Sequence, residues 1–187
     1  MKAFFWGILT LIIIGIIGGA IFIWSGFYNV AADVPHYQLT FWILDAARER
    51  SVEVHSQGIT PPSLKDQKLI NLGFPHFHET CQLCHGAPGI SRTEFAEGLY
   101  PNPPSLRSND VQGELSNAEL FWVVTHGLKM TGMPSFGETH TEEQIWGIIA
   151  FLRRLPEITP EDYRAMVKSV ANTRREEDES GQGGSTG

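Results

Sequence analysis

The longest apolar stretch of the chain stands at its beginning. No charged residue occurs between Lys2 and Asp33. Residues 4–26 are apolar over more than the ~20 residues that a helix needs to cross hydrocarbon, so we predict a membrane-spanning helix there. A cleavable secretory signal is the alternative, because Val30-Ala31-Ala32 resembles a cleavage site, but the apolar part of a signal is usually only ~7–15 residues long. The pattern therefore favours an uncleaved anchor.

The charges that flank this span predict its orientation. Lys2 and the amino terminus are the only positive groups before it, and the positive-inside tendency keeps such a start cytoplasmic. Everything after residue 27 is then expected outside a bacterial inner membrane, on the periplasmic side. Gly15 and Gly19 have the G-x-x-x-G spacing that lets another helix approach closely, so a helix–helix contact through them is a candidate interaction, besides that with the lipid bilayer.

Residues 36–57 carry a second helical pattern. Apolar residues at Leu39, Trp42, Ile43 and Ala46 precede the charged residues 48–50, as is typical of an amphipathic helix. This helix either lies on the membrane surface or against a partner, or it covers one side of the domain that follows. The prolines of residues 57–62 end it and make a linker.

Three further helices are predicted from their ends and periods. The first runs from about Lys65 to the cysteines. The second begins with the capping-box spacing of residues 116–119 and ends at Gly127. The third starts near Thr141 and ends before Pro156. Its apolar face is formed by Ile145, Ile148, Ile149 and Leu152.

The remaining segments lack a sustained period. Residues 86–115 are rich in Gly, Pro, Ser and Asn and are predicted to be loop, which in a compact domain needs something other than secondary structure to pack against. A fourth helix can start at Thr159-Pro160, and the acidic, Gly- and Ser-rich end of the chain predicts disorder.

These patterns predict an all-α protein in four parts. The parts are a transmembrane anchor (1–27), an amphipathic juxtamembrane segment with its linker (28–64), a helical domain (65–160), and a C-terminal helix or tail that is largely disordered (161–187). The hydrophobic content of 42% is that of a folded chain. The net charge of −7, without clustered Lys and Arg, excludes nucleic acid as a partner.

Both cysteines of the chain, Cys81 and Cys84, stand in a C-x-x-C-H pattern with His85. A zinc site needs four Cys or His ligands, and no second pair stands at a suitable spacing. A redox disulfide of thioredoxin type needs a strand–helix unit, and no strand is predicted here. Covalent attachment of haem accounts for all three residues, because each thiol adds to a vinyl group and the imidazole is brought to the iron. It also agrees with the exported position.

Residues 126–137 contain the candidates for a ligand on the other side of the iron. A thioether is a soft, neutral donor that raises the reduction potential and suits reversible electron transfer. Met133 is favoured because it precedes Pro134 in a Gly-rich stretch, whereas Met130 and His126 are structural residues or a swapped ligand. A lone methionine can also simply fill a core.

These residues resemble the class I, mono-haem cytochrome c family, and in particular its membrane-anchored bacterial members, over roughly residues 65–156. The motifs that carry the resemblance are Gly73, Phe77 and Cys81 (G-x-x-x-F-x-x-x-C), the C-x-x-C-H pattern, Pro104-Ser105-Leu106 (P-x-L), Gly132-Met133-Pro134 with Phe136-Gly137, and residues 148–152.

The resemblance implies one covalent haem c held by Cys81, Cys84, His85 and Met133. It also implies that a glycine lets the first and last helices of the domain cross closely. The Pro104 carbonyl would accept the second N–H of the proximal imidazole, although prolines at 101 and 103 leave the acceptor open. The porphyrin is expected to be buried by the last helix and by Phe77, Leu106, Phe121 and Trp122.

The expected function is single-electron transfer between respiratory or dehydrogenase partners, without acid–base catalysis. Donor and acceptor would be membrane or periplasmic redox proteins. Residues 66–160 carry 11 acidic and 6 basic side chains, so docking rules known for basic cytochromes do not apply. Alternatives are a haem-containing subunit or sensor that stays bound to a membrane complex, and a haem peroxidase, which needs an open sixth position on the iron.

Overall fold

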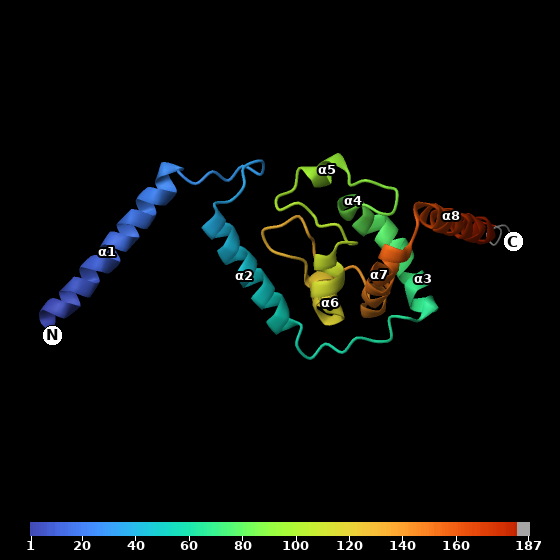
Figure 1. Cartoon of the computed structure of the whole chain (residues 1–187), viewed down its shortest axis with the longest axis horizontal. Helices are drawn as coiled ribbons and strands as arrows, with labels where there is room; N and C mark the ends of the chain where they lie inside the picture. Colours follow the sequence, from blue (N-terminus) through green and yellow to red (C-terminus); the bar gives the residue numbers. More distant parts are fainter. Residues whose placement is uncertain (183–187) are drawn as a thin grey trace. The chain divides into compact units, whose positions relative to one another are not determined.

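The chain forms two compact units, and the second begins at Tyr37. The computed structural model describes residues 1–182. The first unit holds helix α1 (Lys2–Ser25) and the segment up to His36 (Figure 1). Within the described residues, α1 is the one helix that is long and apolar enough to cross a membrane, and none of its residues is buried. It lies where the sequence predicts a span. Nothing approaches Gly15 or Gly19 within 4 Å, and a helix partner there stays a prediction.

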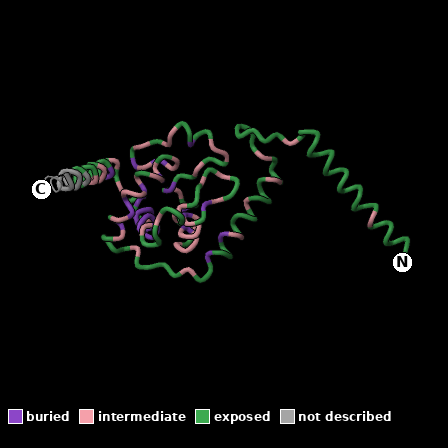
Figure 2. The backbone as a smooth tube through the Cα atoms, turned by 180° about the vertical axis from the view of Figure 1, so that it is seen from behind, coloured by how far each residue is buried: buried purple, intermediate pink, exposed green. Residues whose placement is uncertain are grey.

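Helix α2 (Gln38–His55) opens the second unit, and its buried residue lies near its carboxyl end. Val52 is 4% exposed, and the ring of His55 lies 5.6 Å from that of Trp122 in α6 (Asn117–His126). The first half of α2 is largely exposed (Figure 2). The expected helix is therefore present, and its last turns cover one side of the domain.

A continuous helical rod runs through the middle of the domain. It consists of α3 (Gln67–His76), one π-helical turn (Phe77–Cys81) and the short α4 (Gln82–His85). The Asp66 carboxylate caps its start by accepting from the backbone N–H of Lys68 at 2.9 Å. The rod places both cysteines and His85 at its carboxyl end, as the sequence predicts.

The rod crosses α7 (Glu142–Arg154) at a pair of glycines. A Cβ atom added to Gly73 would lie only 1.9 Å from the carbonyl oxygen of Gly147, so the two backbones are in direct contact. This is the close crossing that the resemblance implies for Gly73. The sequence pattern does not single out its partner, Gly147.

Aromatic rings fill the space beside this crossing. The rings of Phe74 and Phe77 lie 5.2 and 4.9 Å from that of Phe151, and all three side chains are buried. Tyr163 of α8 (Pro160–Gln182) is fully buried against Phe74, which raises the pKa of its hydroxyl through desolvation. The helical domain therefore takes a core residue from the segment beyond residue 160.

The C-terminal segment is helical over more of its length than the sequence pattern suggests. The helix starts where Thr159-Pro160 predicts and continues to Gln182, and the acidic end is described only to that residue. Its first turn is held by the buried side chain of Tyr163 and by a hydrogen bond that the Thr159 hydroxyl donates to the Asp162 carboxylate (2.7 Å).

The other predicted helices also agree with the structure. α6 starts with the predicted capping box of Ser116 and Glu119, and α7 starts with a second one that joins Thr141 and Gln144. The long loop before Ser116 contains two short turns, α5 (Glu94–Glu97) and a π-helical turn (Asp110–Glu114). Over residues 1–182 there is no strand, only one isolated bridge, so the all-α prediction is confirmed.

Arg153, near the end of α7, holds the last part of this loop. Its guanidinium donates to the backbone carbonyls of Val111 (3.1 Å), Gln112 (2.8 Å) and Leu115, and to the Asn117 side-chain oxygen (2.8 Å). All of these acceptors are uncharged. A single cation from α7 therefore joins the short π-helical turn to the start of α6.

Replacing Gly73 by alanine is expected to destabilise the domain. The added methyl group would collide with backbone atoms of Gly147 that cannot rotate away, and overpacking of this kind costs typically about 1–3 kcal/mol. Denaturant unfolding of the purified protein measures the change. Gly113→Ala is the matched control, because nothing lies within 4 Å of that position. Equal unfolding midpoints for the two variants would show that the helices do not cross this closely.

Candidate functional site

The two cysteines lie at the end of the rod as free thiols. Cys81 closes the π-helical turn and is buried, whereas Cys84 is partly exposed in α4. Desolvation raises the pKa of Cys81 to about 11, although its contact with the Thr80 hydroxyl at 3.5 Å acts in the opposite direction. Its thiol is therefore protonated at neutral pH, unlike the low-pKa thiolates of redox-active cysteines.

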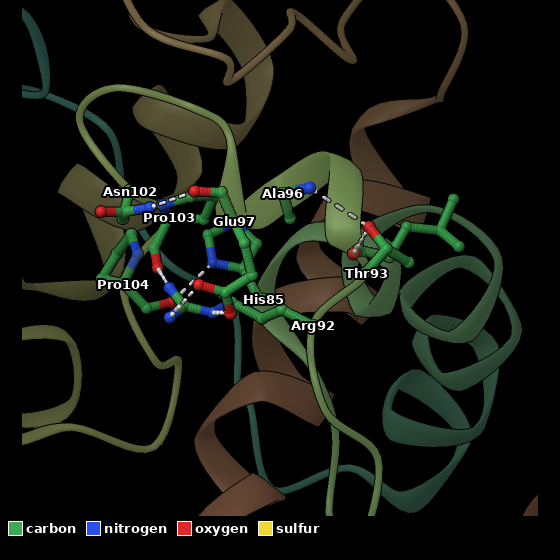
Figure 3. A network of polar contacts seen from close by, with 9 residues as sticks. His85, Arg92, Thr93, Ala96, Glu97, Asn102, Pro103 and Pro104 are labelled. Carbon is green, nitrogen blue, oxygen red and sulfur yellow. Dashed lines mark hydrogen bonds and ion pairs between the residues drawn. The ribbon is translucent and has the colours of Figure 1, made fainter. Parts of the chain in front are cut away.

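His85 is held by one of its two ring nitrogens. Its Nδ1 lies 2.8 Å from the carbonyl oxygen of Pro104, as Figure 3 shows, and the N–H on Nδ1 donates to that oxygen. The imidazole is then a tautomer whose Nε2 carries no proton and can bind a metal. Burial lowers the pKa of His85, which also favours the neutral ring.

The neighbouring carbonyl, that of Pro103, has a different partner. Arg92 donates to it from Nη1 at 2.6 Å and forms an ion pair with the Glu97 carboxylate at 3.0 Å. The Asn102 side chain in turn donates to the Glu97 backbone carbonyl at 3.1 Å (Figure 3). The carbonyl of Pro103 thus accepts from Arg92, and the next carbonyl, that of Pro104, accepts from His85. Among the prolines of this stretch, Pro104 is the one whose carbonyl accepts from the imidazole.

Arg92 is a site residue that the sequence pattern does not reveal. It stands 11 residues before its carbonyl partner, in a stretch without a helical or strand period. A basic residue in such a loop is usually solvated. Only the tertiary fold brings its guanidinium beside the turn that holds His85.

Met133, in the segment between α6 and α7, is less exposed than the other two candidate iron ligands, Met130 and His126. Met133 is partly buried against the core, whereas Met130 is 77% exposed and His126 is exposed. Met130 also has a left-handed backbone (φ 60), which points to a turn residue. Of the three, Met133 alone has its side chain on the inner side of the loop.

Backbone contacts fix the position of this loop. The carbonyl of Met133 accepts from the Leu128 N–H at 3.1 Å, and the N–H of Gly137 donates to the Thr125 carbonyl at 2.9 Å. At Gly132 the loop meets the segment after α5, because an added Cβ would lie 2.6 Å from a methyl group of Leu99. The loops that carry Met133 and Pro104 therefore belong to one packed surface.

The aromatic residues that we expect around a porphyrin lie on two sides of α6. Phe121 stacks on Trp146 of α7 with ring centroids 4.3 Å apart. Trp122 packs instead beside His126 and His55, on the side that faces α2. Phe77 and Leu106 are buried in the core. Contact of any of these four with a porphyrin stays a prediction.

The donor groups fit a haem bound through the chain itself. Cys81 and Cys84 supply two unpaired thiols one helical turn apart, His85 has an oriented, unprotonated Nε2, and Met133 supplies a partly buried thioether. Such a donor set in an all-α domain is typical of cytochromes c.

Comparison with known families leads to the same class. Residues 69–152 match the family described as cytochrome C oxidase, cbb3-type, subunit III. The match indicates a cytochrome c domain, and such domains bind haem and transfer electrons. The comparison with curated proteins gave no match.

Replacing Arg92 by glutamine is expected to loosen the turn at Pro103 and Pro104. The change removes a charge-assisted hydrogen bond, which contributes about 1.5–3 kcal/mol when it is shielded from water, and less here because the Glu97 partner is 57% exposed. We expect faster solvent exchange of the His85 Nδ1 proton, measured by NMR. Arg154→Gln is the control, since it removes an ion pair that is exposed to water. An unchanged exchange rate in the Arg92 variant would contradict this role.

Proposed function

We propose that this protein is a membrane-tethered, mono-haem c-type cytochrome that carries single electrons between respiratory or dehydrogenase partners. The observation that carries the proposal is the C-x-x-C-H segment at the end of the rod, with the His85 Nδ1 bound by the Pro104 carbonyl. That contact leaves Nε2 as the ligand nitrogen. The match of residues 69–152 to a cytochrome c family supports it.

The chain's own residues would hold the haem at four points. The sulfur of each cysteine would add to one carbon of a vinyl group and its proton to the other, which forms a thioether and needs no oxidant. His85 and Met133 would be the axial ligands. Bound in this way, haem c supplies reversible one-electron chemistry.

Met133 and the hydrogen bond to Pro104 then set the properties of the carrier. A neutral sulfur ligand favours ferrous iron, whereas the carbonyl acceptor makes the imidazole a stronger donor. The buried side chains around them exclude water. No proton has to move, and accordingly the proposal assigns no acid–base role to any histidine.

The amino-terminal helix would keep the carrier near its partners. α1 is long and apolar enough to span a bilayer, and the positive-inside tendency puts the haem domain on the periplasmic side. Tethering gives an effective concentration that can reach the mM scale, so a weak and rapidly exchanging contact is sufficient. Because the domain carries excess acidic side chains, partner surfaces are expected to be basic or apolar.

A second candidate function is that of a haem subunit or sensor permanently bound to a membrane complex. The description of the matched family names an oxidase subunit, and Gly15 and Gly19 offer a surface to another helix. Both candidates use the same haem site. They differ in whether the protein leaves its complex to exchange electrons.

Covalent attachment is tested by extracting the protein with acidified acetone. A haem that is joined by two thioethers is expected to stay with the polypeptide after export in a strain competent for cytochrome maturation, and mass spectrometry then shows one haem per chain. The variant Cys81→Ser, Cys84→Ser is the control and should lose its colour. A wild-type chain that loses all its haem would refute the proposal.

Replacing Met133 by alanine is expected to remove the sulfur ligand. The weak far-red band of the ferric protein, which reports a bond between sulfur and iron, should disappear, and the reduction potential should fall. Met130→Ala is the matched control, because that side chain is exposed on the same loop. Survival of both the band and the potential in the Met133 variant would show that another group is the ligand.

A further inference from the structure

The first turns of α2 expose an unusual concentration of apolar side chains. Residues 38–44 carry no charge, and five of their side chains are well exposed. They are Leu39 (68%), Phe41 (50%), Trp42 (65%), Ile43 (50%) and Leu44 (38%). A contiguous exposed patch of this kind on a folded domain marks a place of interaction.

The apolar residues occupy the first turns of α2 and the charged residues the next turns, so the two kinds do not form opposite faces of the helix. At 100° per residue, the five apolar side chains point to all sides of the first turns. Charged residues, from Asp45 to Glu53, occupy rather more than half of the circumference of the next turns. The arrangement differs from the one-sided face that the sequence suggests. It suits a helix that enters an apolar medium by its first turns, because the exposed apolar side chains are concentrated there and no charged residue lies among them.

The charged side chains of the following turns pair with one another within α2. Arg48 pairs with Asp45 at 2.6 Å, and Arg50 pairs with Glu53 at 2.7 Å, in each case within the helix. No excess of positive charge is left to attract anionic lipid. The far end of the helix is fixed to the domain, where Val52 is buried. The exposed apolar turns and the packed turn of α2 therefore lie at opposite ends of the helix.

A bilayer is necessarily within reach of the uncharged end of α2 if α1 spans it. Only residues 26–37 separate the two helices, and twelve residues extend over at most about 40 Å. The uncharged end of α2 is about 10 Å long. Apolar groups of interfacial helices enter the boundary between headgroups and acyl chains by about 5–10 Å, and Trp and Tyr are enriched there.

We propose that the first turns of α2 insert into the interfacial region of the phospholipid bilayer that α1 spans. The inference rests on the tether of the proposed function and adds a second point of attachment to it. The domain is then held to the membrane by a short helix that is packed on α6, and not only by a connector. This contact limits which edge of the cytochrome domain faces membrane partners.

The full-length protein, loaded with haem and placed singly in nanodiscs of phosphatidylcholine, allows a direct test. Ile43→Cys and Arg50→Cys introduce a thiol two turns apart on the same side of α2, at positions that are both exposed in the protein. Because haem attachment consumes Cys81 and Cys84, a nitroxide label reacts only with the new thiol. Electron paramagnetic resonance then compares the access of oxygen, which enters lipid, with that of a water-soluble nickel complex.

We expect the ratio of oxygen access to nickel access to be several-fold higher at residue 43 than at residue 50. The ratio should not depend on added anionic lipid. A water-like ratio at both positions would overturn the inference. Exclusion of both reagents at residue 43 would also overturn it, because protein would then cover the site. Leu39→Cys provides an independent position in the same turns.

The same samples separate this inference from the proposed function. If haem were not attached covalently, each chain would carry extra labels on Cys81 and Cys84, and acidified acetone would remove the colour. A protein with one label, bound haem and a water-like residue 43 would leave the electron carrier intact and refute only the insertion of α2.

Discussion

The direct contact of two helix backbones at Gly73 and Gly147 is the constraint on which the rest of the domain depends. Because the rod from Gln67 to His85 is continuous, the position of its crossing with α7 determines where both cysteines and His85 lie. The aromatic rings beside the crossing fix the remaining rotation. A change of one methyl group at this point would therefore be transmitted along two helical turns to the cysteines.

The other half of the site is built from irregular backbone. The carbonyl of Pro104 lies in a loop that the Arg92 side chain holds, whereas the loop of Met133 is held by backbone hydrogen bonds to the end of α6. Arg92 stabilises the turn that orients the imidazole. A helix fixes the spacing of Cys81 and Cys84, whereas loops carry the Pro104 carbonyl and Met133.

Sequence patterns predict the parts of this structure that depend on neighbours along the chain. The capping box at Ser116, the apolar period of α7 and the C-x-x-C-H spacing are local, and the helices occur where they are expected. Three features escape such patterns because they depend on distant contacts. Gly147 stands out from other helical glycines only because its backbone contacts Gly73. Arg92 acquires its role only where the fold brings it to the Pro103 carbonyl. Tyr163 becomes a core residue only because α8 folds back.

The site residues divide in the same way. The C-x-x-C-H motif identifies His85 as a candidate ligand. Among the neighbouring prolines, the structure identifies Pro104 as the acceptor of its hydrogen bond, because the carbonyl of Pro103 already has Arg92 as its donor. The sequence favours Met133 for its place before Pro134, and the structure separates it from Met130 by its partial burial. Its bond to iron remains a proposal, since the ligand set is a property of the haem-loaded protein.

The guanidinium of Arg153 has a consequence for how the domain assembles. Like a bound calcium ion in many loop-rich proteins, it is surrounded by oxygen atoms, here from a π-helical turn and the start of α6. Unlike an ion, it cannot be chelated or exchanged, and it arrives only with the last turn of α7. The placement of this part of the loop is therefore coupled to the folding of the end of α7.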